Sequence, residues 1–273
     1  EYSEFVDLNK LGAVVTKGVA AVPWAGNPTP RIAETPGGML NAIGLQNPGV
    51  DVFLERDLPF LKRFDTRVVV NVCGHSEEEY VEVVERLREA PVDFLELNIS
   101  CPNVKEGGIA FGTQAKAVEH ITRRVKERAA QPLIVKLSPN VTDITETARA
   151  AEAGGADVLS LINTLTGMKI DIMRRSFVLA NRTGGLSGPA VHPIAVRMVY
   201  DCAHAVKLPL IGMGGISTAA DAIEMILAGA TAVSVGTANF YNPCASEEVA
   251  AGIAAYLEQT GTGDIRELIG AVR

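Results

Sequence analysis

DFLELN, residues 93–98, followed directly by ISCPN, residues 99–103, is the stretch that decides the fold. Its first half is short, rich in apolar residues and alternating, which predicts a β-strand over residues 93–98. Pro102 ends this strand, because proline cannot donate to a sheet and biases the residue before it toward extended or turn geometry. A thiol, Cys101, therefore stands between two asparagines at the carboxyl end of a strand, which is where α/β proteins bind ligands.

Further apolar segments of this kind recur along the chain, and their density of Val, Ile and Leu is typical of strands buried on both faces of a parallel sheet. They predict strands at 12–17, 67–72, 133–138, 157–162, 208–212 and 232–236. Amphipathic helical patterns at 76–90, 142–154 and 217–229 lie between them, each opening on an N-cap type residue. Strand and helix in alternation predict right-handed βαβ units.

Seven predicted strands are one fewer than a closed (β/α)8 TIM barrel contains. The helix-like residues 2–11 lead directly into the first of them, so we expect one barrel domain over residues 1–273, incomplete at its N-terminus because the first strand is missing. An open doubly wound sheet is the competing architecture, but no GxGxxG follows the first strand. The Gly/Pro-rich stretch 26–49 is long for a βα connection, which favours a functional loop over a hinge.

Composition excludes several classes of function. The 273 residues are 47% hydrophobic and carry a net charge of −7, so disorder and nucleic-acid binding are both disfavoured. Apolar runs stay well short of the roughly 20 residues that span a membrane, and the chain opens without a signal-type segment, which predicts a cytoplasmic protein without membrane attachment. The four cysteines show no metal-site spacing, so no metal is expected.

Polar side chains or glycines follow almost every predicted strand. Each could be explained singly as a turn residue or a surface side chain, but their repetition at one end of the barrel indicates a binding site. Glycines after the last two strands stand where barrels commonly build a phosphate site. An ammonium in the barrel mouth needs an anion, so Lys136 either forms a Schiff base or stabilises an anion such as a reduced flavin. The strand-end residues are Lys17, Asn71, Asn98, Cys101, Asn103, Lys136, Asn163, Thr164, Gly214, Gly215, Gly236 and Thr237.

A free cysteine is commonly a small buried hydrophobic residue, and this is the ordinary interpretation of Cys101 by itself. Its place after a strand, beside Pro102 and before the glycine-rich residues 106–112, instead favours a thiol on a loop over the pocket. A thiol is a serviceable general base where its surroundings favour the thiolate.

With these motifs assembled, the chain resembles the class 1 dihydroorotate dehydrogenases, and among them the type B catalytic subunits. The resemblance covers essentially the whole chain. Its segments are TKG (16–18), GNPTPR (26–31), NAIGLQN (41–47), NISCPN (98–103), VKLSP (135–139), INT (162–164), GGLSG (184–188) and the two terminal glycine motifs. The resemblance implies an FMN-binding (β/α)8 barrel that oxidises dihydroorotate to orotate in pyrimidine biosynthesis.

The resemblance also implies roles for individual residues. Cys101 matches the catalytic base that takes the C5 proton while hydride leaves C6 for the flavin. Substrate contacts match Lys17, Asn41, Ala42, Ile43, Gly44, Leu45, Asn98, Asn103, Asn163 and Thr164. FMN contacts match Lys17, Gly18, Asn71, Asn98, Lys136, Ile162, Gly188, Gly214, Gly215, Gly236 and Thr237.

Type B enzymes pass electrons to a separate subunit with FAD and a 2Fe–2S cluster and on to NAD, so the resemblance implies this partner and a homodimer or heterotetramer. The family's first barrel strand precedes the segment with which this chain begins. Three alternatives stay open: a related FMN-dependent dihydropyrimidine oxidoreductase, a Schiff-base lyase that uses Lys136, and a non-catalytic truncated barrel that serves as an interaction module.

Overall fold

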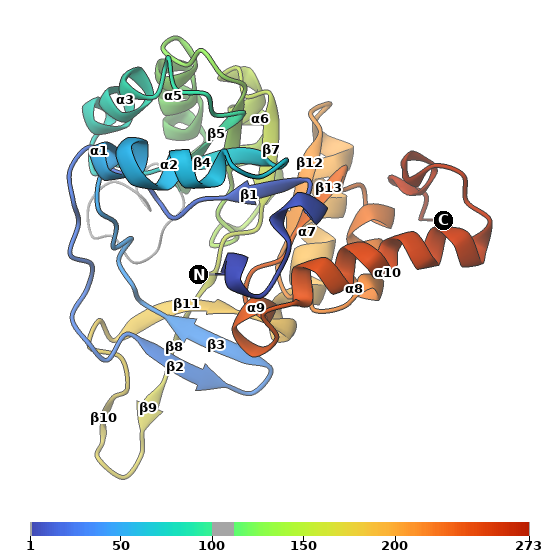
Figure 1. Cartoon of the computed structure of the whole chain (residues 1–273). Helices are drawn as coiled ribbons and strands as arrows, with labels where there is room; N and C mark the ends of the chain where they lie inside the picture. Colours follow the sequence, from blue (N-terminus) through green and yellow to red (C-terminus); the bar gives the residue numbers. More distant parts are fainter. Residues whose placement is uncertain (1, 100–111, 273) are drawn as a thin grey trace.

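The structure, a computed structural model, describes residues 2–99 and 112–272. Its centre is a curled parallel sheet of seven strands with helices outside it (Figure 1). The strands, in spatial order, are β1 (Ala13–Val15), β4 (Arg67–Val72), β5 (Phe94–Asn98), β6 (Leu133–Lys136), β7 (Val158–Leu161), β12 (Leu210–Met213) and β13 (Ala232–Ser234). All seven predicted strands are therefore confirmed, and the alternation of strand and helix is that of a (β/α)8 barrel. In the described part of the chain, β1 and β13 stand at the two ends of this order.

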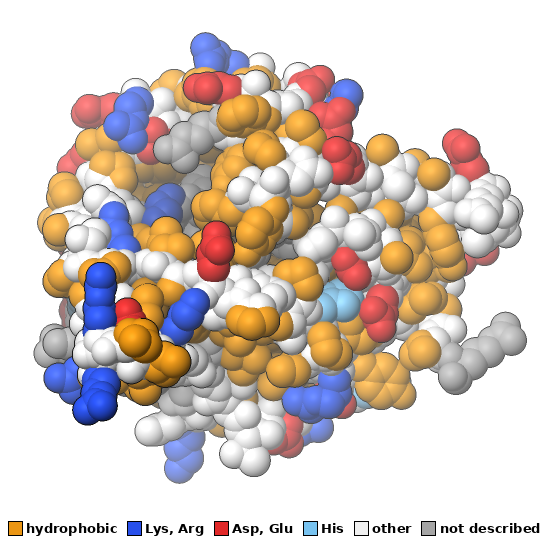
Figure 2. Space-filling view, turned by 90° about the horizontal axis from the view of Figure 1, so that it is seen from below, with side chains coloured by type: hydrophobic (Ala, Val, Ile, Leu, Met, Phe, Trp, Pro, Cys, Tyr) orange, Lys and Arg blue, Asp and Glu red, His pale blue; other side chains and the backbone are white. Residues whose placement is uncertain are grey.

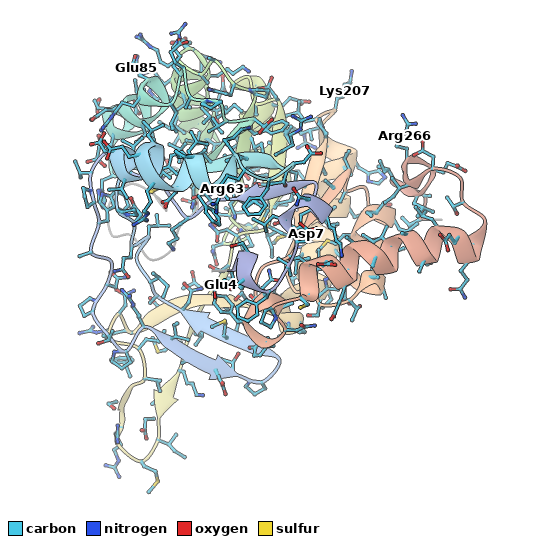
Figure 3. The ribbon with its side chains drawn as sticks, in the orientation of Figure 1. Glu4, Asp7, Arg63, Glu85, Lys207 and Arg266 are labelled. Atoms are coloured by element: carbon cyan, nitrogen blue, oxygen red, sulfur yellow. The ribbon has the colours of Figure 1, made fainter. Side chains whose placement is uncertain are left out.

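The helices cover the outer face of the sheet because each carries one apolar stripe. On α3, this stripe consists of Tyr80, Val83 and Val84, which are fully buried together with Leu87 at the C-cap. The longer helices are α3 (Glu77–Arg86), α5 (Ala115–Lys126), α6 (Ile144–Ala153), α7 (His192–Ala205), α8 (Ala219–Leu227) and α10 (Ala245–Thr260). Charged side chains such as Glu85, Lys207 and Arg266 point away from the barrel (Figure 3).

Local hydrogen bonds shift some predicted boundaries. The helix expected from residue 142 is capped by Asp143, whose carboxylate accepts from Thr145 N, and the helix expected from residue 217 is capped by Thr218. The helix-like residues 2–11 form two short 3-10 helices, η1 (Tyr2–Glu4) and η2 (Leu8–Lys10). The remaining short helices are α1 (Val50–Val52), η3 (Phe53–Asp57), α2 (Leu58–Leu61), η4 (Pro189–Val191), α9 (Ala238–Tyr241) and η5 (Ile265–Leu268).

A second, antiparallel sheet below the barrel in Figure 1 was not predicted. It has the order β2-β3-β11-β8 and is formed by β2 (Ile32–Thr35), β3 (Gly38–Asn41), β11 (Thr183–Ser187) and β8 (Leu165–Met168). Residues 26–49, expected to be a loop, thus contain two strands that pair with the connection between β7 and β12. This pairing places Asn41 opposite Gly185, across 144 residues of sequence.

A small hairpin, β9 (Ile170–Asp171) and β10 (Ser176–Phe177), extends from the antiparallel sheet. Its tip exposes Ile172 and Met173 by 82% and 87%. Seen from below in Figure 2, Lys or Arg side chains and hydrophobic side chains lie together on this side of the molecule, which is hollowed above them in that view. None of the helices in the described residues is both long enough and apolar enough to cross a membrane.

Candidate active site

A cavity of about 210 Å³ lies at the carboxyl ends of the first barrel strands, facing the antiparallel sheet. Its walls come from segments that are far apart in the sequence: the end of β1, the segment after β3, the ends of β4 to β6, and the segment after β7. The lining residues are Val15, Thr16, Lys17, Gly18, Asn41, Ile43, Gly44, Leu45, Asn71, Asn98, Lys136, Asn163 and Thr164. All but Val15 and Thr16 are residues that the sequence singled out.

The cavity combines two ammonium groups with four asparagine amides, and its floor is a buried hydrogen-bond network. Glu96, only 1% exposed, accepts a hydrogen bond from Asn71 Nδ2 at 2.6 Å and another from Ser160 Oγ at 2.8 Å. Lys136 Nζ lies 3.5 Å from the same carboxylate and its side chain is 19% exposed. This ion pair favours the interpretation in which the Lys136 ammonium stabilises an anion over the alternative in which Lys136 forms a Schiff base.

Asn98 connects this network to the helical layer. Its Nδ2 donates to Asn71 Oδ1 at 3.1 Å, and its backbone carbonyl accepts from the Tyr80 hydroxyl at 2.8 Å. Among the described residues, its Oδ1 is buried without a hydrogen-bond partner. A buried polar atom without a partner costs free energy, which is typical of a position where a ligand completes the hydrogen bonds.

The antiparallel sheet supplies one wall of the cavity through close backbone approach. A Cβ on Gly185 would lie 2.0 Å from Thr164 Oγ1, so only glycine lets β11 pass this close to the cavity wall. The segment that follows β3 turns at Gly44 and Leu45, with φ of 74° and 52°.

The predicted contact Ala42 does not line this cavity. Its side chain is fully buried, and its carbonyl accepts from Asn27 Nδ2 at 3.0 Å. The structure therefore brings its neighbours Asn41, Ile43 and Gly44 to the cavity wall and places Ala42 behind them.

The predicted glycine cluster lies directly after the carboxyl ends of β11 and β12. Gly188, Gly214 and Gly215 have positive φ of 106°, 127° and 71°, and a Cβ on Gly215 would lie 2.8 Å from Gly188 O. Successive N–H groups in such turns form anion-binding concavities. Gly236 faces open space, since a Cβ there would meet nothing within 4 Å.

Neighbouring contacts tie the glycine cluster together. Thr237 Oγ1 donates to Ser187 Oγ at 2.8 Å, which joins the residue after Gly236 to β11. Ile162 packs against Gly214, where a Cβ would come within 3.3 Å of Ile162 Cγ1. These predicted residues are thus adjacent to one another, although they do not line the cavity described above.

Some functional-looking residues escaped the sequence reasoning. His192, at the start of α7, places Nδ1 2.9 Å from Gly214 O and Nε2 3.1 Å from Glu224 Oε2, so it supports the glycine turn. Glu96 is the one charged residue of β5, flanked by Leu95 and Leu97, and this charge between two apolar residues was the available signal. Cys101 and Asn103, which the sequence predicts as base and substrate contact, lie outside the described residues.

A parallel α/β barrel with a polar cavity at its strand ends and a glycine cluster beyond it defines an α/β-barrel enzyme that binds small polar ligands. The family model described as dihydroorotate dehydrogenase matches residues 1–257. The chain belongs to the dihydroorotate dehydrogenase family.

Individual relatives agree with this assignment. The chain is 71% identical over 273 residues, all of this chain and 91% of the relative, to the catalytic subunit of dihydroorotate dehydrogenase B (NAD(+)) from Lachnoclostridium phytofermentans. It is 62% identical over 270 residues, 99% of this chain and 89% of the relative, to the protein of the same name from Alkaliphilus oremlandii. A crystal structure of DHODH from Eimeria tenella in complex with ferulenol superposes with a TM-score of 0.78 at 25% identity, covering 93% of this chain and 77% of that chain.

Proposed function

We propose that this chain is the catalytic subunit of a type B, NAD-linked dihydroorotate dehydrogenase, which oxidises dihydroorotate to orotate in pyrimidine biosynthesis. The observation that carries the proposal is the single cavity that collects Lys17, Lys136 and the asparagines from strand ends and from the antiparallel sheet. Relatives that are 71% and 62% identical to this chain are named as catalytic subunits of dihydroorotate dehydrogenase B, which favours an enzyme over a non-catalytic barrel. The main core cluster contains residues from Val19 to Val249 and is accompanied only by a smaller cluster around Leu40 among the described residues, which supports a single domain.

The residues present fit FMN as the cofactor. Gly188, Gly214 and Gly215 lie together with positive φ, a geometry in which successive backbone N–H groups can bind a phosphate, and the space beside Gly236 is open. Lys136 and Asn71 would hold its ring system, and the Lys136 ammonium would stabilise negative charge on that ring. FMN, when bound, accepts the hydride of the reaction.

The residues of the cavity also fit a planar ring with a carboxylate. Asparagine amides both donate and accept, which suits alternating carbonyl and N–H groups. Asn41, Asn98 and Asn163 would bind the ring of dihydroorotate. The ammonium of Lys17, on the same wall as Gly18, would neutralise charge on the ligands.

Cys101 is the proposed general base, on the strength of the family motif, with Asn103 as a further substrate contact. Its thiolate would take the proton from C5 of dihydroorotate while the hydride leaves C6, so that a C–C double bond forms and the thiol carries the proton away. The chain's own part is to hold the ring, to place the base and to hold Lys136 at the cavity wall.

The proposed electron acceptor is a partner subunit with FAD and a 2Fe–2S cluster, which reduces NAD. The names of the relatives, with their words "catalytic subunit" and "NAD(+)", support a partner subunit and NAD as the final electron acceptor. The FAD and the 2Fe–2S cluster rest on the family resemblance alone. A homodimer or heterotetramer and the cytoplasmic location expected from the sequence stay predictions.

Replacing Cys101 tests the proposal directly. Cys101→Ala should keep the yellow flavin spectrum and lose at least a hundredfold in dihydroorotate oxidation, because general-base catalysis contributes roughly 10²–10⁴-fold. The matched control is Cys244→Ala, because Cys244 does not line the cavity and contacts Phe5 O at 3.6 Å. A colourless wild-type protein, or full activity in Cys101→Ala, would overturn the proposal.

A further inference from the structure

Glu96 is a buried carboxylate directly beneath the cavity, although it does not line it. It projects from β5 and is 1% exposed. Side chains on β4, β6 and β7 contact it: Asn71, Lys136 and Ser160. A buried carboxylate is costly unless hydrogen bonds and an opposite charge compensate it, so three such partners indicate a position where the charge is needed.

The hydrogen bonds of this network have a direction that Glu96 determines. A carboxylate only accepts, so Asn71 must present its NH₂ group, Nδ2, to Glu96 Oε1 at 2.6 Å. Asn71 Oδ1 then faces Asn98, and Asn98 must also present its Nδ2, at 3.1 Å. The two amides are thereby oriented in series.

The last atom of this series is Asn98 Oδ1, which is buried and has no hydrogen-bond partner among the described residues. Because Asn98 lines the cavity, a ligand that donates a hydrogen bond completes the series, whereas a ligand that presents an acceptor or a methyl group there is penalised. Dihydroorotate and orotate carry ring N–H groups of this kind.

We propose that Glu96 is a positioning residue that fixes the Asn71 and Asn98 amides, so that Asn98 Oδ1 selects an N–H group of the substrate ring. The inference rests on the proposed function, since it assumes that the pyrimidine ring occupies this cavity. The same carboxylate holds Lys136 Nζ at 3.5 Å, which keeps the ammonium at the cavity wall.

The test compares ligand selectivity in two substitutions of Glu96. Purified protein with its cofactor is titrated calorimetrically with orotate, 1-methylorotate and 3-methylorotate. Wild-type protein should prefer orotate at least tenfold over one of the methylated rings. Glu96→Met removes the acceptor and should reduce this preference at least fivefold, because the amides can then reverse. Glu96→Gln keeps an oxygen that accepts from Asn71 Nδ2 and should retain the preference within twofold.

Leu97→Met is the matched control, since Leu97 is the next residue of β5 and is fully buried on the opposite face of the strand. This volume-conserving change should leave the preference unchanged. Loss of the preference in Leu97→Met to the same extent as in Glu96→Met would reduce Glu96 to a general packing role and overturn the proposal. A Glu96→Met protein with wild-type preference would overturn it as well.

A second measurement keeps the proposal testable if Glu96→Met does not fold. In wild-type protein with ¹⁵N-labelled asparagine, the side-chain NH₂ groups of Asn71 and Asn98 should both be protected from hydrogen exchange, and rapid exchange at Asn71 would refute the network. Wild-type protein that does not bind orotate contradicts the proposed function instead, so the two failures are distinguishable.

Discussion

Gly185→Ala is the substitution whose effect follows most directly from the geometry of the cavity wall. Gly185 is buried in β11, where it pairs with Asn41 of β3 and Thr166 of β8. A Cβ there would lie 2.0 Å from Thr164 Oγ1 and 2.6 Å from Thr164 Cβ. Both distances are far inside van der Waals contact, so Thr164 or β11 must move by about 1 Å or more.

The expected cost is at the upper part of the usual range for overpacking, about 2–3 kcal/mol, because the clash includes the Cβ of Thr164 and not only the end of a flexible side chain. At roughly 2–4 °C per kcal/mol for a domain of this size, the melting temperature should fall by roughly 5–10 °C. Because Thr164 lines the cavity, the KM for dihydroorotate should rise about tenfold.

Gly167→Ala is the matched control, because Gly167 lies in the adjacent strand β8, directly opposite Gly184. A Cβ at Gly167 would lie 3.0 Å from Leu40 Cδ2, the end of a side chain that can shift, and in ordinary contact with Leu186 Cβ at 3.8 Å. Thermal unfolding and steady-state kinetics of the two variants should therefore differ. Equal melting temperatures and an unchanged KM in Gly185→Ala would refute the steric reasoning.

Three further substitutions or probes test other parts of the molecule. Lys136→Met should slow bleaching of the flavin by dihydroorotate about a hundredfold in rapid mixing, since a preorganised cation at a developing anion is worth that much; an unchanged rate contradicts the assigned role. Burial raises the pKa of the Cys202 thiol to about 12, so iodoacetamide at pH 8 should alkylate it roughly a thousandfold more slowly in native than in unfolded protein, as peptide mapping can measure. Burial would raise the pKa of Asp221, but hydrogen bonds from Ser217 N and from Thr218 hold this pKa below its usual 3.8. Asp221→Asn should therefore lower the free energy of unfolding in urea by about 1 kcal/mol at pH 7, and this deficit should shrink as the pH falls below about 4. A deficit that is constant with pH would contradict this.

The sequence was sufficient to predict the parallel strands and most of the residues that gather at their ends. Segments such as Arg67–Val72 and Leu133–Lys136 are short, apolar and rich in β-branched residues, and this local pattern is enough because strands buried on both faces need little else. Lys17, Asn71, Asn98 and Lys136 could be found by reading the last residue of each strand, since parallel strands bring their carboxyl ends to one side.

The antiparallel sheet could not be predicted in this way. Its strands β2, β3, β8 and β11 are short and contain glycine or polar residues without a clear alternation, and the pairing of β3 with β11 joins segments more than 100 residues apart. Loop and strand are equally compatible with such local sequence, so only the tertiary partner decides between them. Asn41 and Thr164 therefore line the same cavity because the strands beside them pair in the folded chain, which no local sequence pattern predicts.

The sequence by itself determined the strand and helix order, the chemical types at the strand ends and the family, because these depend on periodicity and on motifs that are contiguous in the chain. Only the tertiary structure decided the proposed role of Glu96, because the sequence pattern identified it merely as a polar position in an alternating strand. Its contacts come from β4, β6 and β7, and the direction of the hydrogen bonds through Asn71 to Asn98 exists only when these strands lie side by side. A hydrogen-bond donor and its acceptor must approach within about 3 Å, and that proximity is a property of the folded chain.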